Sequence, residues 1–153
     1  MNAVTLKRYL SRYDQLINTA QQLLLPALLL LFRLWLGWVF FRSGLLKFNS
    51  WDSTLYLFEY EYQVPLLPWL WAAYLGTAAE LILPLFIVPG LLTRPMALLL
   101  FGFNAIAVIS YPLLWSRGFY DHQLWGLMML ILLIWGPGRY SLDHWLRRTI
   151  TRA

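Results

Sequence analysis

Three polar residues, Arg33, Glu80 and Asn104, each interrupt a different long apolar stretch of the sequence. At about 1.5 Å per residue along a helix, each of the three lies roughly 12 to 14 Å from one end of its own stretch, and these three ends lie on one side when the helices pack together. A guanidinium, a carboxylate and an amide at one level can satisfy one another's hydrogen bonds. We therefore predict an Arg33–Glu80 ion pair completed by Asn104. Two interpretations stay open: a buried clamp that fixes helix register, or a polar pocket that binds a ligand headgroup or passes a proton.

A second group of polar residues borders the opposite ends of these stretches and consists of Arg42, Lys47, Asp121 and His122. Histidine titrates near neutral pH and can exchange protons. Lys47 or Arg42 can bind an anion or a quinone oxygen, so this group is a candidate ligand site. The alternative is a solvated rim of charges that marks a membrane boundary. The pattern leaves the cofactor open, with quinone as one candidate.

Other chemistries find little support in the residues. The chain contains no Cys, which excludes disulfides, thiolate metal sites and thiol exchange by this chain alone. His122 and His144 are the two histidines, and neither has a neighbour at metal-ligand spacing, so we predict no metal site. No phosphate-binding loop, dinucleotide fingerprint or catalytic triad can be recognised. The residues leave open whether the protein is an enzyme.

The composition indicates which elements must position these groups. Of 153 residues, 60% are hydrophobic and 12% are charged, against roughly 25% charged residues in a soluble domain. We therefore expect a single integral membrane domain over residues 1–153. The net charge of +5 flanks apolar stretches and has no soluble domain behind it. This favours the lipid bilayer as partner and argues against nucleic acid.

Four stretches approach the about 20 residues that a helix needs to cross a membrane. They cover residues 23–41, 66–88, 95–114 and 122–135. Thr93, with its hydroxyl, is the expected cap of the third span, and Gly136 to Gly138 should end the fourth. Residues 42–65 are then the one long external loop. Small-residue rows in the second span, such as Ala72 with Gly76, predict close helix packing within the bundle, with a homodimer seam as the alternative.

The flanking segments are amphipathic. Residues 1–22 carry apolar side chains at helical spacing with charges opposite, which is typical of a helix in the headgroup layer. In the tail, residues 139–153, Ser141 can cap a short helix with Asp143 in its first turn. The predicted fold is all-α: a transmembrane four-helix up-down bundle with an N-terminal amphipathic interfacial helix and a short C-terminal interfacial helix.

The basic residues predict the orientation. With both termini in the cytoplasm, that side carries eight basic residues: Lys7, Arg8, Arg12, Arg94, Arg139, Arg147, Arg148 and Arg152. The other side carries Arg42, Lys47 and Arg117. Because basic residues are enriched in cytoplasmic loops, we predict a multi-pass protein of the bacterial inner membrane with both termini inside.

Several short motifs resemble the DoxX family of small four-helix bacterial membrane proteins. They comprise Arg33–Gly37, Ser43–Lys47, Glu80, Gly90–Arg94 and Gly136–Asp143, the last being the most specific. The resemblance implies a four-span bundle in a redox neighbourhood. Relatives include the small membrane subunit of thiosulfate:quinone oxidoreductase, components of oxidative-stress complexes, and proteins encoded beside metal- or peptide-handling genes. Arg33, Lys47, Glu80, Arg94, Gly136, Gly138 and Arg139 transfer as motif positions, without assigned roles.

The resulting hypothesis is a membrane subunit of a bacterial redox or detoxification system. This subunit either passes electrons to the quinone pool or anchors a protein partner that does so. The alternative is a non-catalytic membrane scaffold or a small-solute carrier. The sequence leaves the substrate, the partner and the oligomeric state undetermined.

Overall fold

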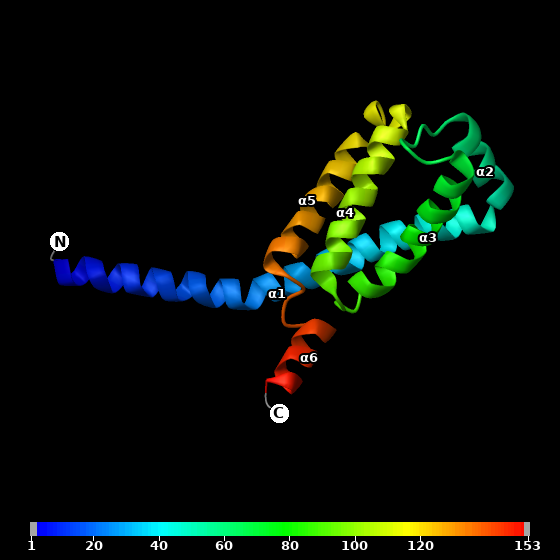
Figure 1. Ribbon diagram of the computed structural model, residues 1–153. Helices are drawn as coiled ribbons and strands as arrows, with labels where there is room; N and C mark the ends of the chain where they lie inside the picture. Colours follow the sequence, from blue (N-terminus) through cyan, green and yellow to red (C-terminus); the bar gives the residue numbers. More distant parts are fainter. Residues whose placement is uncertain (1–2, 152–153) are drawn as a thin grey trace.

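The computed structural model describes residues 3–151, which form helices joined by short turns (Figure 1). In chain order the helices are α1 (Ala3–Asn49), α2 (Trp51–Tyr60), α3 (Trp69–Ile87), α4 (Thr93–Ser110), the short 3-10 helix η1 (Pro112–Trp115), α5 (Phe119–Trp135) and α6 (Leu142–Ile150). Arg152, one of the basic residues counted above, lies outside the described residues.

α1 is much longer than the span predicted at residues 23–41, with 47 residues in one helix. The expected break between an interfacial helix and the first span is absent from this helix, because Gln21 and Gln22 are good helix formers and Pro26 removes a single backbone donor. Residues 42–65, expected as one long external loop, are mostly helical. α1 continues to Asn49, and α2 occupies most of the remainder.

Four helices pack in a ring, in which α1 lies beside α3, α3 beside α4, α4 beside α5, and α5 beside α1. Figure 1 shows the C-terminal half of α1 crossing the other three helices, while its N-terminal half projects beyond them. The buried core between the four helices consists of Leu29, Leu36, Phe40, Ile87, Ala97, Leu100, Met129 and Leu132. We call this ring the helical body.

α2 packs along the start of α3 and forms a smaller second core. Phe58 of α2 is buried with Ala72 and Ala73 of α3. A side chain at Gly76 would lie 3.3 Å from the Phe58 ring. The small-residue rows therefore serve packing inside the chain, one of the two interpretations offered above, because they admit an aromatic ring between two helices.

The turns that follow α3 and α5 are joined to each other. α5 ends at Trp135, and Gly136 follows with φ +81, as the Gly-Pro-Gly stop predicts. Ser141 accepts a hydrogen bond from the His144 backbone N–H and caps α6, which confirms that prediction.

The expected cap of α4 is wrong. The Thr93 hydroxyl has no partner in the described chain, and the Asp143 carboxylate instead accepts from the backbone N–H groups of Leu92 and Thr93 at 2.8 and 2.9 Å.

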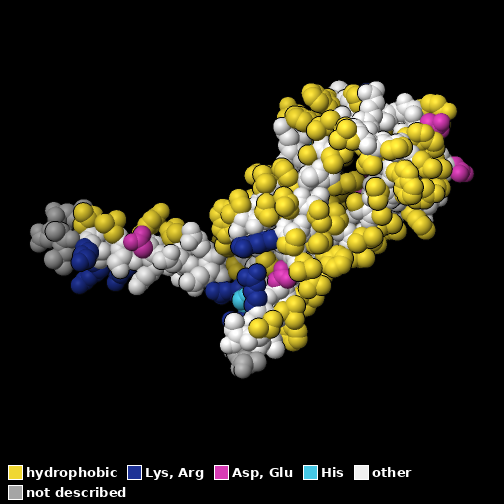
Figure 2. Space-filling model, viewed as in Figure 1, with side chains coloured by type: hydrophobic (Ala, Val, Ile, Leu, Met, Phe, Trp, Pro, Cys, Tyr) yellow, Lys and Arg dark blue, Asp and Glu magenta, His cyan; other side chains and the backbone are white. Residues whose placement is uncertain are grey.

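α1, α3 and α4 are each long and apolar enough to cross a membrane, and α5 is apolar but shorter. Figure 2 shows hydrophobic side chains over most of the visible face of the helical body. Lys and Arg side chains gather along the N-terminal half of α1 and near α6. This separation of an apolar body from a basic end is typical of a membrane protein.

Candidate ligand site

Lys47 of α1 and Glu80 of α3 form the one ion pair among the residues that the structure describes. Lys47 Nζ lies 2.7 and 2.6 Å from the two carboxylate oxygens of Glu80. The same ammonium donates to Ser43 Oγ at 2.9 Å, one helical turn earlier. All three of its donors are thus engaged. The Lys47 and Glu80 side chains are 18% and 8% exposed, so the pair is a fixed polar element within apolar surroundings.

Arg33 takes no part in this pair, so the predicted Arg33–Glu80 ion pair is wrong. Its side chain is fully buried and donates to two backbone carbonyls, those of Val88 at 2.9 Å and of Tyr140. Both carbonyls belong to chain turns at the end of the molecule that carries α6. Arg33 therefore links the turn after α3 to the turn after α5.

The register between α1 and α3 explains the difference. A side chain at Gly44 would lie within 3.0 Å of Glu80 and Leu81, which places Glu80 opposite the C-terminal part of α1. Gly37 instead faces Val88. Because the two helices run antiparallel, Arg33, one turn before Gly37, reaches past the end of α3. Depths counted from the ends of apolar stretches miss this register, since α1 extends well beyond its apolar part.

Asn104 pairs with His122 and does not contact Arg33, which corrects the third member of the predicted cluster. The Asn104 amide nitrogen donates to the His122 backbone carbonyl at 3.0 Å, so its oxygen faces His122 Nδ1 at 2.7 Å. That oxygen only accepts, so Nδ1 carries the proton. His122 Nε2 remains free to accept a hydrogen bond. The Trp125 ring packs edge-on against the imidazole, with centroids 4.7 Å apart.

A cavity of about 740 Å³ lies between α3 and α4, beneath the segment that follows α2. This is within the range of about 300 to 1,000 Å³ that is usual for ligand pockets. Its polar lining includes Ser43, Lys47, Glu80 and His122, and its aromatic lining includes Phe58, Tyr62, Phe103 and Tyr111. Leu75, Leu98 and Leu99 form part of the wall and are about half exposed, at 54%, 54% and 56%. The cavity therefore borders the apolar outer surface of the helical body.

Two further polar groups on the cavity wall are unpaired within residues 3–151. Ser110 is buried at 3% exposure, and its hydroxyl has no hydrogen-bond partner there. The Tyr62 hydroxyl makes no described hydrogen bond, and burial, the principal cause, raises its pKa to about 12. Tyr62 therefore stays a neutral donor at physiological pH. With His122 Nε2, three polar atoms of cavity-lining residues make no hydrogen bond in the described chain, and the Ser110 hydroxyl is the buried one among them.

The cavity brings together two of the four residues predicted to form a ligand site. Lys47 and His122 line it, whereas Arg42 and Asp121 are exposed and lie outside it. Ser43, Tyr62 and Ser110 were not among the predicted site residues. Ser43 could have been found from its position four residues before Lys47, which places both on one helix face. No sequence signal marks Ser110, because its importance comes from its missing partner.

The remaining motif positions connect the turn after α3 to the turn after α5. The backbone N–H groups of Leu142 and Asp143 donate to the carbonyls of Pro89 and Gly90 at 3.0 and 2.9 Å. Gly90 has φ +73, and a side chain there would collide with the Arg33 guanidinium. Gly136 and Gly138 also have positive φ, and Arg94 Nη2 donates to the Ile134 carbonyl at 3.1 Å. These motif positions thus share a structural role, and Arg139 is exposed beside them.

Metal ligands do not cluster in the described part of the chain, where no group of three or more His, Asp or Glu side chains could hold an ion. His122 lines the cavity between α3 and α4, while His144 lies at the start of α6.

A family comparison agrees with the motifs up to Arg94, whereas the Gly136–Asp143 motif lies outside the matched residues. The DoxX family matches residues 28–112, which include α3, α4 and most of the C-terminal half of α1. Neither the curated proteins nor the solved structures gave a match. The matched region contains both members of the Lys47–Glu80 pair and most of the cavity lining. The chain is a member of the DoxX family of membrane proteins.

Proposed function

We propose that this protein is a quinone-binding membrane subunit of a bacterial redox or detoxification system, with the quinone headgroup in the cavity between α3 and α4. The observation that carries the proposal is the combination of a large, mainly apolar cavity with two hydroxyl donors on its wall that make no described hydrogen bond, those of Ser110 and Tyr62. A flat ring with two carbonyl oxygens and an apolar tail matches this combination.

The cavity residues have distinct parts in the proposed site. The Ser110 and Tyr62 hydroxyls donate to carbonyl oxygens of the headgroup, while Phe58 and Phe103 lie along the ring. His122 holds a proton on Nδ1 through Asn104, so its Nε2 can take up a proton from solvent and pass it to a quinone oxygen as the quinone is reduced. When bound, a quinone supplies a two-electron, two-proton acceptor. In this proposal the electrons come from a protein partner, since the chain has no cysteine thiol that could supply them.

The Lys47–Glu80 pair sets the polarity of the cavity. Its ammonium and carboxylate are already paired to each other and to Ser43. The pair therefore supports the site by holding α1 against α3, and by presenting a fixed dipole to the headgroup. This makes it a positioning element in the proposal, with no direct exchange of protons.

The proposal includes a membrane arrangement. α5, a mainly apolar helix of 17 residues, joins α1, α3 and α4 as a fourth span. Both termini then lie on the cytoplasmic side of the inner membrane, because basic side chains gather at the end that carries α6 (Figure 2). The cavity lies toward the opposite face. Its half-exposed leucines border the lipid, so a ligand dissolved in the bilayer enters between α3 and α4.

Binding of a short-chain benzoquinone with a decyl tail tests the proposal. Purified protein is titrated with it while intrinsic tryptophan fluorescence is followed. Gly102 lines the cavity, and a Cβ atom there would meet nothing within 4 Å, so we expect the ring in Gly102→Phe to enter the cavity without displacing the backbone. We expect Gly102→Phe to abolish binding. Ser110→Ala and Tyr62→Phe should each weaken it by roughly threefold to tenfold, the value of one hydrogen bond.

The matched control is Leu85→Phe, a substitution at an exposed position on α3 outside the cavity lining. It should bind as the unmodified protein does. Equal binding by Gly102→Phe and Leu85→Phe would overturn the proposal. A quinone-free preparation that copurifies a soluble protein would favour the scaffold. Solute uptake into proteoliposomes that is lost in Glu80→Gln would favour the carrier.

A further inference from the structure

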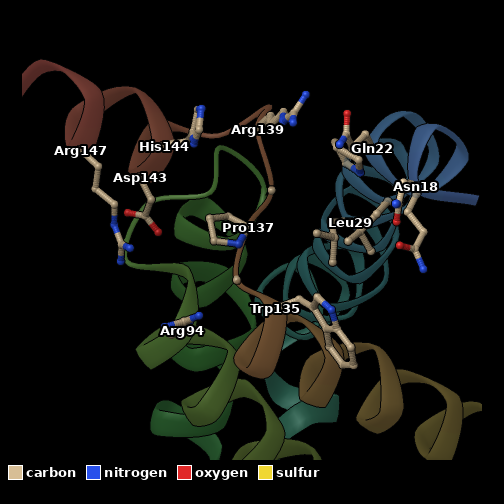
Figure 3. A pocket seen from close by; sticks show the side chains of 15 residues that line it. Asn18, Gln22, Leu29, Arg94, Trp135, Pro137, Arg139, Asp143, His144 and Arg147 are labelled. Carbon is tan, nitrogen blue, oxygen red and sulfur yellow. The ribbon is translucent and has the colours of Figure 1, made fainter. Parts of the chain in front are cut away.

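A second pocket, of about 480 Å³, lies at the other end of the molecule, where α1 leaves the helical body. Figure 3 shows Asn18 and Gln22 of α1 on one side, with Arg94 of α4 and Arg147 of α6 across from them. Arg139 extends from the turn between α5 and α6. The proposed quinone cavity shares no residue with this pocket.

The pocket has an excess of positive charge. Arg94, Arg139 and Arg147 line it with one carboxylate, that of Asp143. Both oxygens of Asp143 accept backbone N–H groups at the start of α4, so this carboxylate is already occupied. None of the three arginines forms an ion pair within residues 3–151. Their charge is therefore available to an anion from outside the chain.

The arginines project from fixed backbone. Gly136 and Gly138 give the turn its positive φ angles, and Ser141 Oγ donates to the Gly138 carbonyl at 2.7 Å. A side chain at Gly138 would lie 3.2 Å from Leu29, so the turn packs directly on α1. A preorganised turn loses less conformational entropy on binding than a free tail does.

The opposite wall adds uncharged donors and an apolar floor. The amide side chains of Asn18, Gln21 and Gln22 line the pocket from α1, and His144 lines it from α6. Its apolar lining includes Leu25, Pro26, Leu29 and Trp135. Guanidinium groups bind phosphate oxygens in pairs through their planar fork. Basic pockets at helix ends beside a membrane commonly receive anionic lipid headgroups.

We propose that this pocket binds a phosphate group, carried by an anionic phospholipid or by a soluble phosphate compound. Arg139 and Arg147 contact the phosphate oxygens, the amides of α1 donate to its remaining oxygens, and the apolar floor lies beneath any attached carbon chain. The site is independent of the quinone proposal, because it depends on different residues.

The test compares the full-length protein with Arg139→Gln/Arg147→Gln. The control is Arg42→Gln/Arg117→Gln, which removes equal charge from two exposed arginines outside the pocket. Lipid binding is measured by native mass spectrometry during titration with phosphatidylglycerol and, separately, phosphatidylcholine. Inorganic phosphate and pyrophosphate are titrated by calorimetry. We expect the pocket variant to lose at least about tenfold in affinity, and the control to change by less than about twofold.

The two arms identify the source of the phosphate. Variant-sensitive preference for phosphatidylglycerol assigns the site to a lipid, whereas variant-sensitive binding of inorganic phosphate or pyrophosphate alone assigns it to a soluble compound. Absence of binding in both arms, or equal losses in the pocket and control variants, overturns the proposal. If the double variant unfolds, Arg147→Gln alone, at an exposed position in the last turn of α6, gives the same comparison.

Discussion

Removing one member of the Lys47–Glu80 pair should destabilise the protein strongly. Glu80→Met leaves the Lys47 ammonium without its carboxylate, in a position where that side chain is 18% exposed. Leaving one charge of a buried pair without its partner costs about 3–5 kcal/mol. For a chain of this size, 1 kcal/mol lowers the melting temperature by about 2–4 °C, so we expect a loss of about 10 °C. Lys47→Met should have a similar effect, because it leaves the Glu80 carboxylate unpaired.

The double variant Lys47→Met/Glu80→Met separates pairing from packing. An apolar pair of similar volume often replaces a buried ion pair at little cost, so its unfolding free energy should lie at least about 3 kcal/mol above the value expected from adding the two single losses. Unfolding is measured in mild detergent by thermal melting and by titration with a denaturing detergent. Arg42→Met, at an exposed arginine on the same helix, is the control and should melt like the unmodified protein. Single variants that match this control, or strictly additive losses, would refute the assigned pairing.

Three further predictions concern the turns and the cavity wall. Gly90→Ala should destabilise the protein by more than about 1 kcal/mol in thermal melts, because φ at Gly90 is +73 and the new side chain meets Arg33 and Ser141. The control Gly102→Ala has open space around the new Cβ and should be neutral or stabilising by up to about 1 kcal/mol. Asp143→Ala should lower stability by about 1–2 kcal/mol in the same assay, because the N-terminus of α4 loses its cap. The pKa of Tyr62 is raised to about 12, above its value in the unfolded chain, so its contribution to stability should be complete below pH 10 and lost between about pH 10 and 12. Melts at alkaline pH measure this loss. A Tyr62→Phe variant that loses as much stability over this range as the unmodified protein would contradict the prediction.

Local features of the fold could be predicted from the sequence because they depend on neighbouring residues. Gly136 ends α5, and Ser141 caps α6, since both effects act within a few positions of the chain. The length of α1 was not predicted, because the apolar pattern changes near residue 22 while helix propensity does not. A change of environment along a helix is not a change of secondary structure.

The partners of the polar residues could not be predicted, although their burial could. Arg33, Glu80 and Asn104 are all buried, as their cost in an apolar environment suggests. Their partners depend on how far α1 slides along α3, which Gly37 and Gly44 determine through close packing. The cavity likewise arises from incomplete contact between α3 and α4. Neither property can be read from the apolar pattern of a single helix.

Photoaffinity labelling with an azido-substituted benzoquinone tests the central claim, that the cavity between α3 and α4 binds a quinone, most directly. The protein is labelled in membranes with and without excess unlabelled quinone, digested, and mapped by mass spectrometry. We expect competed labelling on the cavity-lining parts of α3 and α4, residues 72–80 and 98–110, with loss of that labelling in Gly102→Phe. Labelling spread over the lipid-facing surface, unaffected by competitor and by Gly102→Phe, would contradict it.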